Sequence, residues 1–326
     1  KYIDNKTVFY NDAMKNPVKC DFVITNPPYL YQNKLKDNSI LINSRHTDLY
    51  QLSLEKIMDS KEGIVIVPIN FLSAENSKYI RDIFLYKFNI IKANYFSEQV
   101  FDDTTYNVVA FYYKQKNSGD NRDKMFVDFT IFPENKRINL ELFREYHWQI
   151  GGEFLAPINE YSNPLNITRL EEEDLKTGNY KIKIAYNHLD ICREFSVDKA
   201  TFDKIKSNII ILKAIDTGSD GGRICLDDIR KYNYDALVSV KTSRNQINLV
   251  FPKTVSIQEQ ERLIKLFNKE IEDKRNQYHS LFMTNYRDKN RKRISFNFTY
   301  NFINYLYFSK LKKGERNVFA EQPTLF

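Results

Sequence analysis

A short apolar segment runs directly into two prolines near the start of the chain, in the sequence DFVITNPPY (Asp21–Tyr29). Proline has no amide hydrogen and a fixed φ, so two in succession end a β-ladder and hold the next residues extended. The pattern predicts a buried strand over residues 18–25 followed by a rigid loop. Taken alone, the four loop residues could equally form an ordinary turn at the end of a strand. They are Asn26, Pro27, Pro28 and Tyr29.

Apolar strand patterns alternate with amphipathic helix patterns over the first third of the chain. Such alternation predicts an α/β fold with a mainly parallel sheet covered on both faces. Sheets of this kind bind ligands at the carboxyl ends of their strands, where the proline loop is expected. The predicted strands span residues 18–25, 63–68, 90–96 and 106–113, and the predicted helices span residues 48–60 and 73–86.

The loop residues suit chemistry on a conjugated amino group. The nitrogen of such a group is a poor nucleophile until hydrogen-bond acceptors draw its N–H bonds toward tetrahedral geometry. The side-chain oxygen of Asn26 and the backbone oxygen of Pro27, held at a fixed separation, can accept both N–H bonds. Tyr29 offers a ring on which a base taken out of a duplex could stack.

This stretch resembles the gamma-class N6-adenine DNA methyltransferases of restriction-modification systems, the TaqI-like group, in which (D/N)PP(Y/F) follows the fourth strand of a methyltransferase sheet. Further segments resemble the same family in the same order, and together they cover about a third of the chain. They are YNDAM (residues 10–14), DLY and LEK (48–50 and 54–56), GIVIVP (63–68), and VF with NVVAF (100–101 and 107–111).

The resemblance implies roles for individual residues. Asn26 and Pro27 would polarise the amino group, with Pro28 keeping the loop rigid. Tyr29 and Phe101 would contact the flipped adenine on opposite sides. The cofactor would be S-adenosyl-L-methionine, with Asp12 holding its adenine and with Ala13 and Asn26 also at its site.

The family also needs a glycine-rich turn and an acidic residue upstream of the Asp12 segment, and only eleven residues precede Asp12. We therefore expect a partial class I methyltransferase (Rossmann-like) sheet, with the rest of the cofactor site upstream in the natural polypeptide or on a companion chain. The glycine cluster at residues 216–223 does not follow the pattern of the missing turn.

A second region follows the α/β pattern. Its short mixed segments predict a mixed α+β DNA target-recognition domain, and Ser256 with Glu259 predicts a capped helix with Leu263, Ile264, Phe267 and Ile271 on one face. We expect a catalytic portion at residues 1–150, a recognition domain at 151–310 and a basic tail at 311–326.

The chain has a formal net charge of +7, which suits double-stranded DNA as a partner. Basic residues cluster near residue 290. The aromatic residues that follow them are expected to form the inner face of a strand or helix. Lys213 and Arg223 beside the glycine cluster could meet phosphates or lie in a solvated loop. The candidate DNA-binding residues are Lys213, Arg223, Arg287, Lys289, Arg291, Lys292 and Arg293.

Other features narrow the functional class. No apolar run is long enough to span a membrane and no secretory signal is recognisable, so a soluble, cytoplasmic protein is expected. Three widely spaced cysteines predict buried thiols, and the four scattered histidines indicate no metal site. The end of the chain, QPTLF, resembles the peptide by which bacterial DNA enzymes bind the sliding clamp through Gln322, Leu325 and Phe326, although the tail could instead pack on its own domain.

The sequence thus predicts a DNA adenine-N6 methyltransferase that needs no metal. Two alternatives stay open: a methyltransferase that acts on an rRNA base or a protein glutamine amide, and a non-catalytic DNA-recognition subunit of a modification complex.

Overall fold

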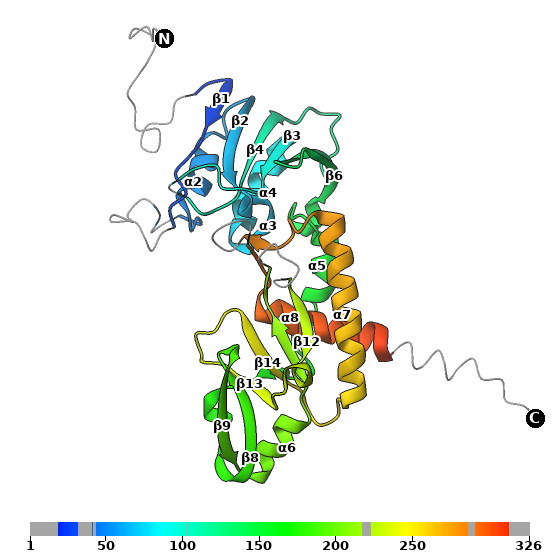
Figure 1. The fold of residues 1–326 in the computed structure, drawn as a ribbon. Helices are drawn as coiled ribbons and strands as arrows, with labels where there is room; N and C mark the ends of the chain where they lie inside the picture. The colour runs from blue at the N-terminus through cyan, green and yellow to red at the C-terminus, as the bar shows by residue number, and fades with distance from the viewer. Residues whose placement is uncertain are drawn as a thin grey trace, which may run out of the picture. The chain divides into compact units, whose positions relative to one another are not determined.

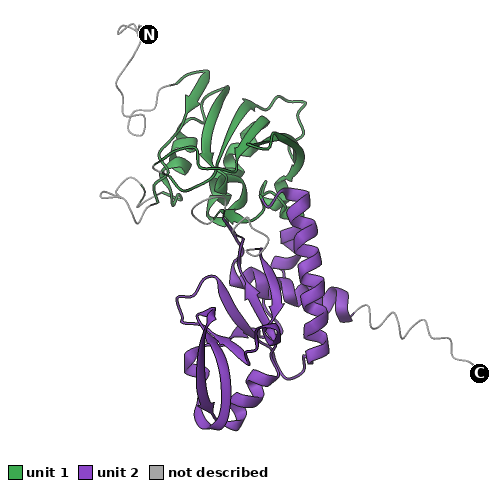
Figure 2. Ribbon diagram, viewed as in Figure 1, with its two compact units in different colours: residues 1–153, 281–290 green, residues 154–280, 291–326 purple. Residues whose placement is uncertain are grey.

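The computed structural model describes residues 19–31, 41, 44–102, 104–216, 223–285 and 291–312. The chain divides into two compact units (Figure 2). Unit 1 comprises residues 1–153 and 281–290, and unit 2 comprises residues 154–280 and 291–326. Several predicted site residues lie outside the described residues. They are Asp12, Ala13, Arg287, Lys289, Gln322, Leu325 and Phe326.

Unit 1 contains a six-stranded sheet in the order β1-β2-β4-β3-β5-β6 (Figure 1). β1 runs parallel to β2 and β3 runs parallel to β5, whereas the pairs β2/β4, β3/β4 and β5/β6 are antiparallel. The prediction of a mainly parallel sheet is therefore wrong. No helix joins β3 to β4 or β5 to β6, and such short connections join antiparallel neighbours. The strands are β1 (Phe22–Thr25), β2 (Glu62–Pro68), β3 (Phe88–Phe96), β4 (Val108–Gln115), β5 (Lys124–Phe132) and β6 (Lys136–Phe143).

β1 differs from the predicted buried strand. It is an edge strand, and its apolar side chains are open to solvent: Phe22 is 46% exposed and Ile24 is 73% exposed. On β2, Ile64 faces the same solvent, whereas Val65 and Val67 are fully buried. Within the described residues the apolar side chains on one face of β1 and β2 are thus open to solvent, whereas the other face of β2 is buried.

Among the described residues, unit 1 has three short helices, and the last of them, Lys78–Lys87, packs on β3. The single helix predicted for residues 73–86 is interrupted at Ala74, whose backbone is extended. The guanidinium of Arg81, fully buried, donates from Nη1 to the backbone oxygens of Phe71 and Ala74, each at 3.0 Å, which satisfies carbonyls at the break. The helices of unit 1 are α2 (Leu49–Lys56), α3 (Asn70–Ser73) and α4 (Lys78–Lys87), with 3-10 turns at Glu75–Ser77 and Arg144–Tyr146.

Unit 2 contains small sheets and several helices, of which the two longest pack together (Figure 1). One sheet has the order β12-β10-β14-β7 and another the order β13-β8-β9. Its strands are β7 (Thr168–Arg169), β8 (Thr177–Tyr186), β9 (His188–Val197), β10 (Ile210–Lys213), β11 (Ile215–Asp216), β12 (Cys225–Asp228), β13 (Ala236–Val238), β14 (Gln246–Val250) and β16 (Lys292–Arg293). Its helices are α6 (Lys199–Lys206), α7 (Ile257–Tyr278) and α8 (Phe296–Leu306); α5 (Gly152–Asn159) begins at the unit boundary.

The long helix α7 confirms the predicted capping box. The Ser256 hydroxyl accepts from the Glu259 amide at 3.2 Å, and the Glu259 carboxylate accepts from the Ser256 amide at 2.8 Å. The aromatic residues after position 295 are expected to form a strand or a helix. In the structure they form the helix α8. Phe302 is fully buried on this helix and packs on Phe267 of α7, with ring centroids 4.9 Å apart.

The expectation of buried thiols is wrong for Cys20 and Cys192, which are exposed, while Cys225 is half-buried. No helix within the described residues is long and apolar enough to cross a bilayer.

Candidate active site

The proline loop begins where β1 ends, at the carboxyl edge of β1 and β2. The last residue of β1, Thr25, pairs with Val65 of β2. Pro27 is buried, whereas Asn26 and Pro28 are exposed. The loop is thus anchored by one proline while it presents an amide side chain to solvent at the end of a strand.

The Tyr29 hydroxyl fixes the position of the Asn26 side chain. It lies 2.5 Å from Asn26 Oδ1 and 3.0 Å from the backbone oxygen of Ile66 on β2. The hydroxyl has one proton to share between these two acceptors. An amide oxygen has two lone pairs, so Asn26 Oδ1 can accept a further hydrogen bond from a ligand.

A buried tyrosine backs the ring of Tyr29. The rings of Tyr29 and Tyr50 meet edge to face, with centroids 6.5 Å apart and an interplanar angle of 85°. The Tyr50 hydroxyl lies 2.7 Å from Ser77 Oγ, and burial raises the pKa of Tyr50 to about 12. Tyr50 is therefore a neutral residue that supports the ring of Tyr29, and its hydroxyl is hydrogen-bonded to Ser77.

Asp48 lies beside the segment that follows the proline loop. The amide of Leu49 donates to the Leu30 oxygen at 3.1 Å, and Tyr31 forms an isolated antiparallel bridge with Asp48. The Asp48 carboxylate caps α2 by accepting from the Tyr50 amide at 3.3 Å. Burial raises the pKa of Asp48 to about 6, although backbone hydrogen bonds from Tyr50, Leu30 and Leu49 oppose the shift. Near neutral pH this site therefore holds a buried charge.

Three asparagines form a network at the same edge of the sheet. Asn285 Oδ1 accepts from the Asn107 amide at 2.7 Å, and Asn285 Nδ2 donates to Asn107 Oδ1 at 2.9 Å. Asn70 Oδ1 accepts from the Asn285 amide at 3.0 Å. Asn107 and Asn285 are 2% exposed. The sequence gives no local signal for this network, because its members lie far apart along the chain.

Phe101 lies in the connection between β3 and β4. Tyr95 of β3 pairs with Val109 of β4, so this connection lies at the carboxyl end of β3 and the amino end of β4. Since β4 is antiparallel to β2, this is the edge at which the proline loop begins. Phe101 is half-buried, and its backbone oxygen accepts from Gln99 Nε2 at 2.9 Å.

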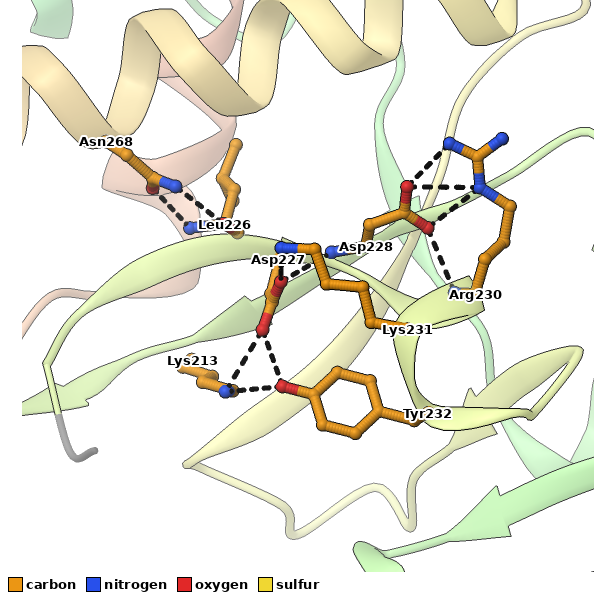
Figure 3. A network of polar contacts seen from close by, with 8 residues as sticks. All are labelled: Lys213, Leu226, Asp227, Asp228, Arg230, Lys231, Tyr232 and Asn268. Carbon is orange, nitrogen blue, oxygen red and sulfur yellow. Dashed lines mark hydrogen bonds and ion pairs between the residues drawn. The ribbon is translucent and has the colours of Figure 1, made fainter.

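Two of the predicted DNA-binding cations are held by carboxylates in unit 2. Figure 3 shows Lys213 Nζ between Asp227, at 3.2 Å, and the Tyr232 hydroxyl, at 2.8 Å. Burial alone would raise the pKa of Asp227, but hydrogen bonds, led by those from Lys231 and Tyr232, lower it to about 2. Arg223 Nη1 lies 3.4 Å from Glu272 Oε1. Lys213 therefore has a structural role in this network.

The side chains of the basic run near residue 290 differ in their exposure to solvent. Arg291 is exposed, and the Arg293 guanidinium lies 5.7 Å from the centroid of the Phe296 ring. Lys292 is 3% exposed, and burial lowers its pKa to about 7 although Asp216 opposes the shift. Lys292 therefore departs from the expected solvent-facing phosphate contact, because strand pairing of β16 with β11 turns its side chain inward.

Two of the histidines pair with single carboxylates in unit 1. His46 Nε2 lies 2.5 Å from Glu55 Oε2, and His147 Nδ1 lies 2.8 Å from Asp82 Oδ2. In the part of the chain that the structure describes, no group of three or more His, Cys, Asp or Glu side chains is placed to hold a metal ion.

The model of the Eco57I restriction-modification methylase family matches residues 1–101, which include the proline loop and β2. A search of curated proteins gives no match.

Several solved structures are similar to parts of the chain. The type IIL restriction-modification enzyme MmeI in complex with DNA is 12% identical, with 86% of this chain and 46% of that chain covered and a TM-score of 0.48. A modification subunit of a putative type I restriction enzyme from Vibrio vulnificus YJ016 is 18% identical, with 51% and 37% covered and a TM-score of 0.29. The M protein of the type I enzyme EcoKI is 16% identical, with 37% and 28% covered and a TM-score of 0.30.

This chain thus spans less than half of each of these proteins.

Proposed function

We propose that the chain is the catalytic and DNA-recognition portion of an S-adenosyl-L-methionine-dependent DNA adenine-N6 methyltransferase of the restriction-modification type. The observation that carries this proposal is the proline loop, in which Asn26 is exposed and its Oδ1 is held by the Tyr29 hydroxyl. The family match over residues 1–101 supports it.

In this proposal the loop acts on the amino group of a flipped adenine. The free lone pair of Asn26 Oδ1 and the backbone oxygen of Pro27 accept the two N–H bonds and favour tetrahedral geometry at the nitrogen. Because the prolines restrict the backbone, the two acceptors need little reorganisation as the nitrogen becomes nucleophilic. Tyr29 and Phe101 contact the faces of the base, and the released proton passes to water or a backbone acceptor.

S-adenosyl-L-methionine would supply the electrophilic methyl group. Of the residues assigned to its site, Asn26 is exposed at the loop, and Asp12 and Ala13 lie outside the described residues. The exposed apolar side chains of β1 are consistent with a covering element on that face of the sheet.

Double-stranded DNA is the proposed partner of the recognition domain at residues 151–310. Arg291 is the exposed member of the basic run within the described residues, and Arg287 and Lys289 are assigned to DNA from the sequence. Lys213 and Lys292 are assigned instead to the internal contacts described above. Clamp binding by Gln322, Leu325 and Phe326 remains a separate proposal, which fails if removal of residues 322–326 leaves clamp retention unchanged.

The experiment is single-molecule mapping of N6-methyladenine in the genome of the source cells. Cells with the natural gene are compared with cells carrying Asn26→Ala and with cells carrying Lys114→Met, which alters an exposed side chain on β4. Loss of methylation at one sequence motif in Asn26→Ala alone supports the proposal. An unchanged pattern in all three overturns it and favours the RNA, protein or non-catalytic alternatives.

A further inference from the structure

A hollow in unit 1 lies at the opposite end of the sheet from the proline loop. Glu62, at the amino end of β2, pairs with Lys114, near the end of β4, whereas Pro68 pairs with Val108. Lys116, which follows β4, is therefore at the amino end of β2, and the proline loop is at the carboxyl end. A cavity of about 720 Å³ opens beside Lys116. Its volume lies within the range typical of small-molecule sites.

The wall of this cavity contains a buried ammonium group that has no hydrogen-bond partner. Lys116 is 6% exposed, and its Nζ makes no hydrogen bond in the part of the chain that the structure describes. The Nζ lies 4.3 Å from the centroid of the buried Trp148 ring, a cation–π contact. Burial, with Arg122 and Arg144 nearby, lowers the pKa of Lys116 to about 8, so the group is mostly charged at neutral pH. A buried cation without an anionic partner is costly, and an incoming anion would relieve that cost.

Two guanidinium groups lie at the mouth of the same cavity. Arg144 Cζ is 4.9 Å and Arg122 Cζ is 5.7 Å from the centroid of the Tyr86 ring, and Tyr86 is 46% exposed. Among the lining residues the carboxylate is that of Asp82, which is bonded to His147 Nδ1. Asp123 lies 3.6 Å from Arg144 Nη1, and Asp120 also acts on Lys116. The lining residues therefore carry more cations than carboxylates.

The backbone at this cavity adopts an unfavourable conformation. His147 and Trp148 are consecutive and both have φ of 56°, in the left-handed region that bulky residues rarely occupy. Arg81 Nε donates to the His147 oxygen at 2.6 Å, and the Trp148 amide donates to the Phe143 oxygen at 2.8 Å. Strain that the surroundings enforce is concentrated at functional sites in proteins.

We propose that this cavity binds a small phosphate-bearing ligand of the nucleoside phosphate class, with its phosphate bound by Arg122 and Arg144 and attracted by the positive charge of Lys116, whose Nζ is covered in the cavity wall. The apolar side chains of Met58 and Ile83 line the remainder and suit the uncharged part of the ligand. A duplex backbone fits less well, because the Lys116 ammonium is covered in the wall of a cavity and does not lie on a convex surface. The proposal is independent of the methyl transfer proposed for the other end of the sheet.

The sole tryptophan of the chain reports on this site directly, because Trp148 contacts Lys116. Trp148 fluorescence of the 326-residue chain is followed during titration with AMP, ATP, pyrophosphate and adenosine, and calorimetry is run in parallel. AMP or ATP is expected to change the fluorescence saturably. Adenosine is expected to bind at least about tenfold more weakly, because it lacks the negatively charged phosphate.

Two variants and two matched controls locate the binding. Lys116→Met keeps a side chain over Trp148 and should weaken ATP binding about tenfold or more. Arg122→Gln alters an exposed side chain, so it tests the same site without a risk to folding. Lys114→Met and Arg137→Gln, which change exposed residues that do not line the cavity, should bind ATP as the unaltered chain does.

Three results would overturn the proposal. One is the absence of any saturable signal with the phosphate compounds. Another is equal affinity for adenosine and AMP, which would remove the role of the phosphate. The third is a response to a duplex oligonucleotide that Lys116→Met abolishes while mononucleotides give none, which would assign the cavity to a nucleic acid backbone.

Discussion

At the carboxyl end of β2, unit 1 presents amides and hydroxyls, whereas at the amino end of β2 it presents cations beside aromatic rings. The first end brings together Asn26, Tyr29 and the Asn107–Asn285 pair. The second end contains Lys116 over Trp148, with Arg144 and Arg122 beside Tyr86. Neutral acceptors suit a neutral amino group, and cations suit an anion.

The difference shows that one sheet can hold two unlike sets of side chains in the loops at its two ends. The carboxyl end of β2, which we call the loop end, owes its geometry to proline and to hydrogen bonds between side chain and backbone. The cationic end owes its geometry to cation–π contacts and to two left-handed residues, His147 and Trp148. Single substitutions can therefore alter each end separately.

Asn26→Ala should have the largest effect on methyl transfer. It removes one of the two proposed acceptors of the adenine amino group, and loss of a preorganised polar group of this kind lowers kcat by about 10²–10³-fold. Single-turnover transfer by the natural polypeptide measures the effect. Lys114→Met is the control, and equal rates in the two variants would contradict the proposed role of Asn26.

Gly63→Ala should destabilise the sheet on which both ends depend. A Cβ at this position would overlap the backbone oxygen of Val23 on β1 and lie 2.7 Å from the Tyr113 hydroxyl. Overpacking against a backbone atom that cannot move freely should cost about 3 kcal/mol in the free energy of unfolding. Urea denaturation measures this cost. Gly119→Ala is the matched control, since its Cβ would meet nothing within 4 Å, and similar losses in both variants would refute the packing argument.

Asp48→Asn should stabilise the loop end at neutral and alkaline pH. The pKa of Asp48 is raised from 3.8 to about 6 in the folded chain, so between these values the folded state holds a proton that the unfolded state lacks. Stability therefore falls as pH rises from 4 to 6, and the full cost remains above that window. Asparagine keeps the cap without the charge, so the variant should be more stable by about 2 to 3 kcal/mol at pH 8 and little changed at pH 4.

Thermal or urea unfolding at both pH values measures the Asp48→Asn effect. The control is Asp59→Asn, which changes an exposed carboxylate and should shift stability by less than about 0.5 kcal/mol. A benefit of the same size at pH 4 and pH 8 would show that the buried charge is not its source.

Tyr29→Phe should have the smallest effect. It removes the hydroxyl that contacts Asn26 Oδ1 and the Ile66 oxygen and keeps the ring. We expect kcat to fall about three- to tenfold, because one hydrogen bond that orients Asn26 is lost. The KM for DNA should be unchanged, since stacking on the ring remains. A raised KM with unchanged kcat would assign the hydroxyl to DNA binding and not to the orientation of Asn26.

Local patterns in the sequence predict where two of the elements begin or end. Two prolines after an apolar run located the end of β1, and Ser256 with Glu259 located the start of α7. These features depend on interactions between neighbours along the chain. The exposure of β1 could not be predicted in this way, because it depends on which elements pack on its face in the folded chain.

Contacts between distant residues account for the remaining differences. The Asn107–Asn285 pair joins positions 178 residues apart, so no local pattern marks it. The sequence predicts phosphate contacts for Lys213 beside the glycine cluster and for Lys292 in the cluster of cations, yet the fold places Lys213 beside Asp227 and buries Lys292. The cavity beside Lys116 was missed for the same reason, since its cations come from separate segments of unit 1.

Identification of the methyl acceptor tests the central claim most directly. The purified natural polypeptide is incubated with isotopically labelled S-adenosyl-L-methionine and, separately, with duplex DNA, ribosomal RNA and protein, and labelled products are identified by mass spectrometry. Label in N6-methyladenine of DNA that disappears with Asn26→Ala is the predicted result. Label in RNA, in cytosine or in glutamine, or DNA labelling that persists in Asn26→Ala, would contradict the account.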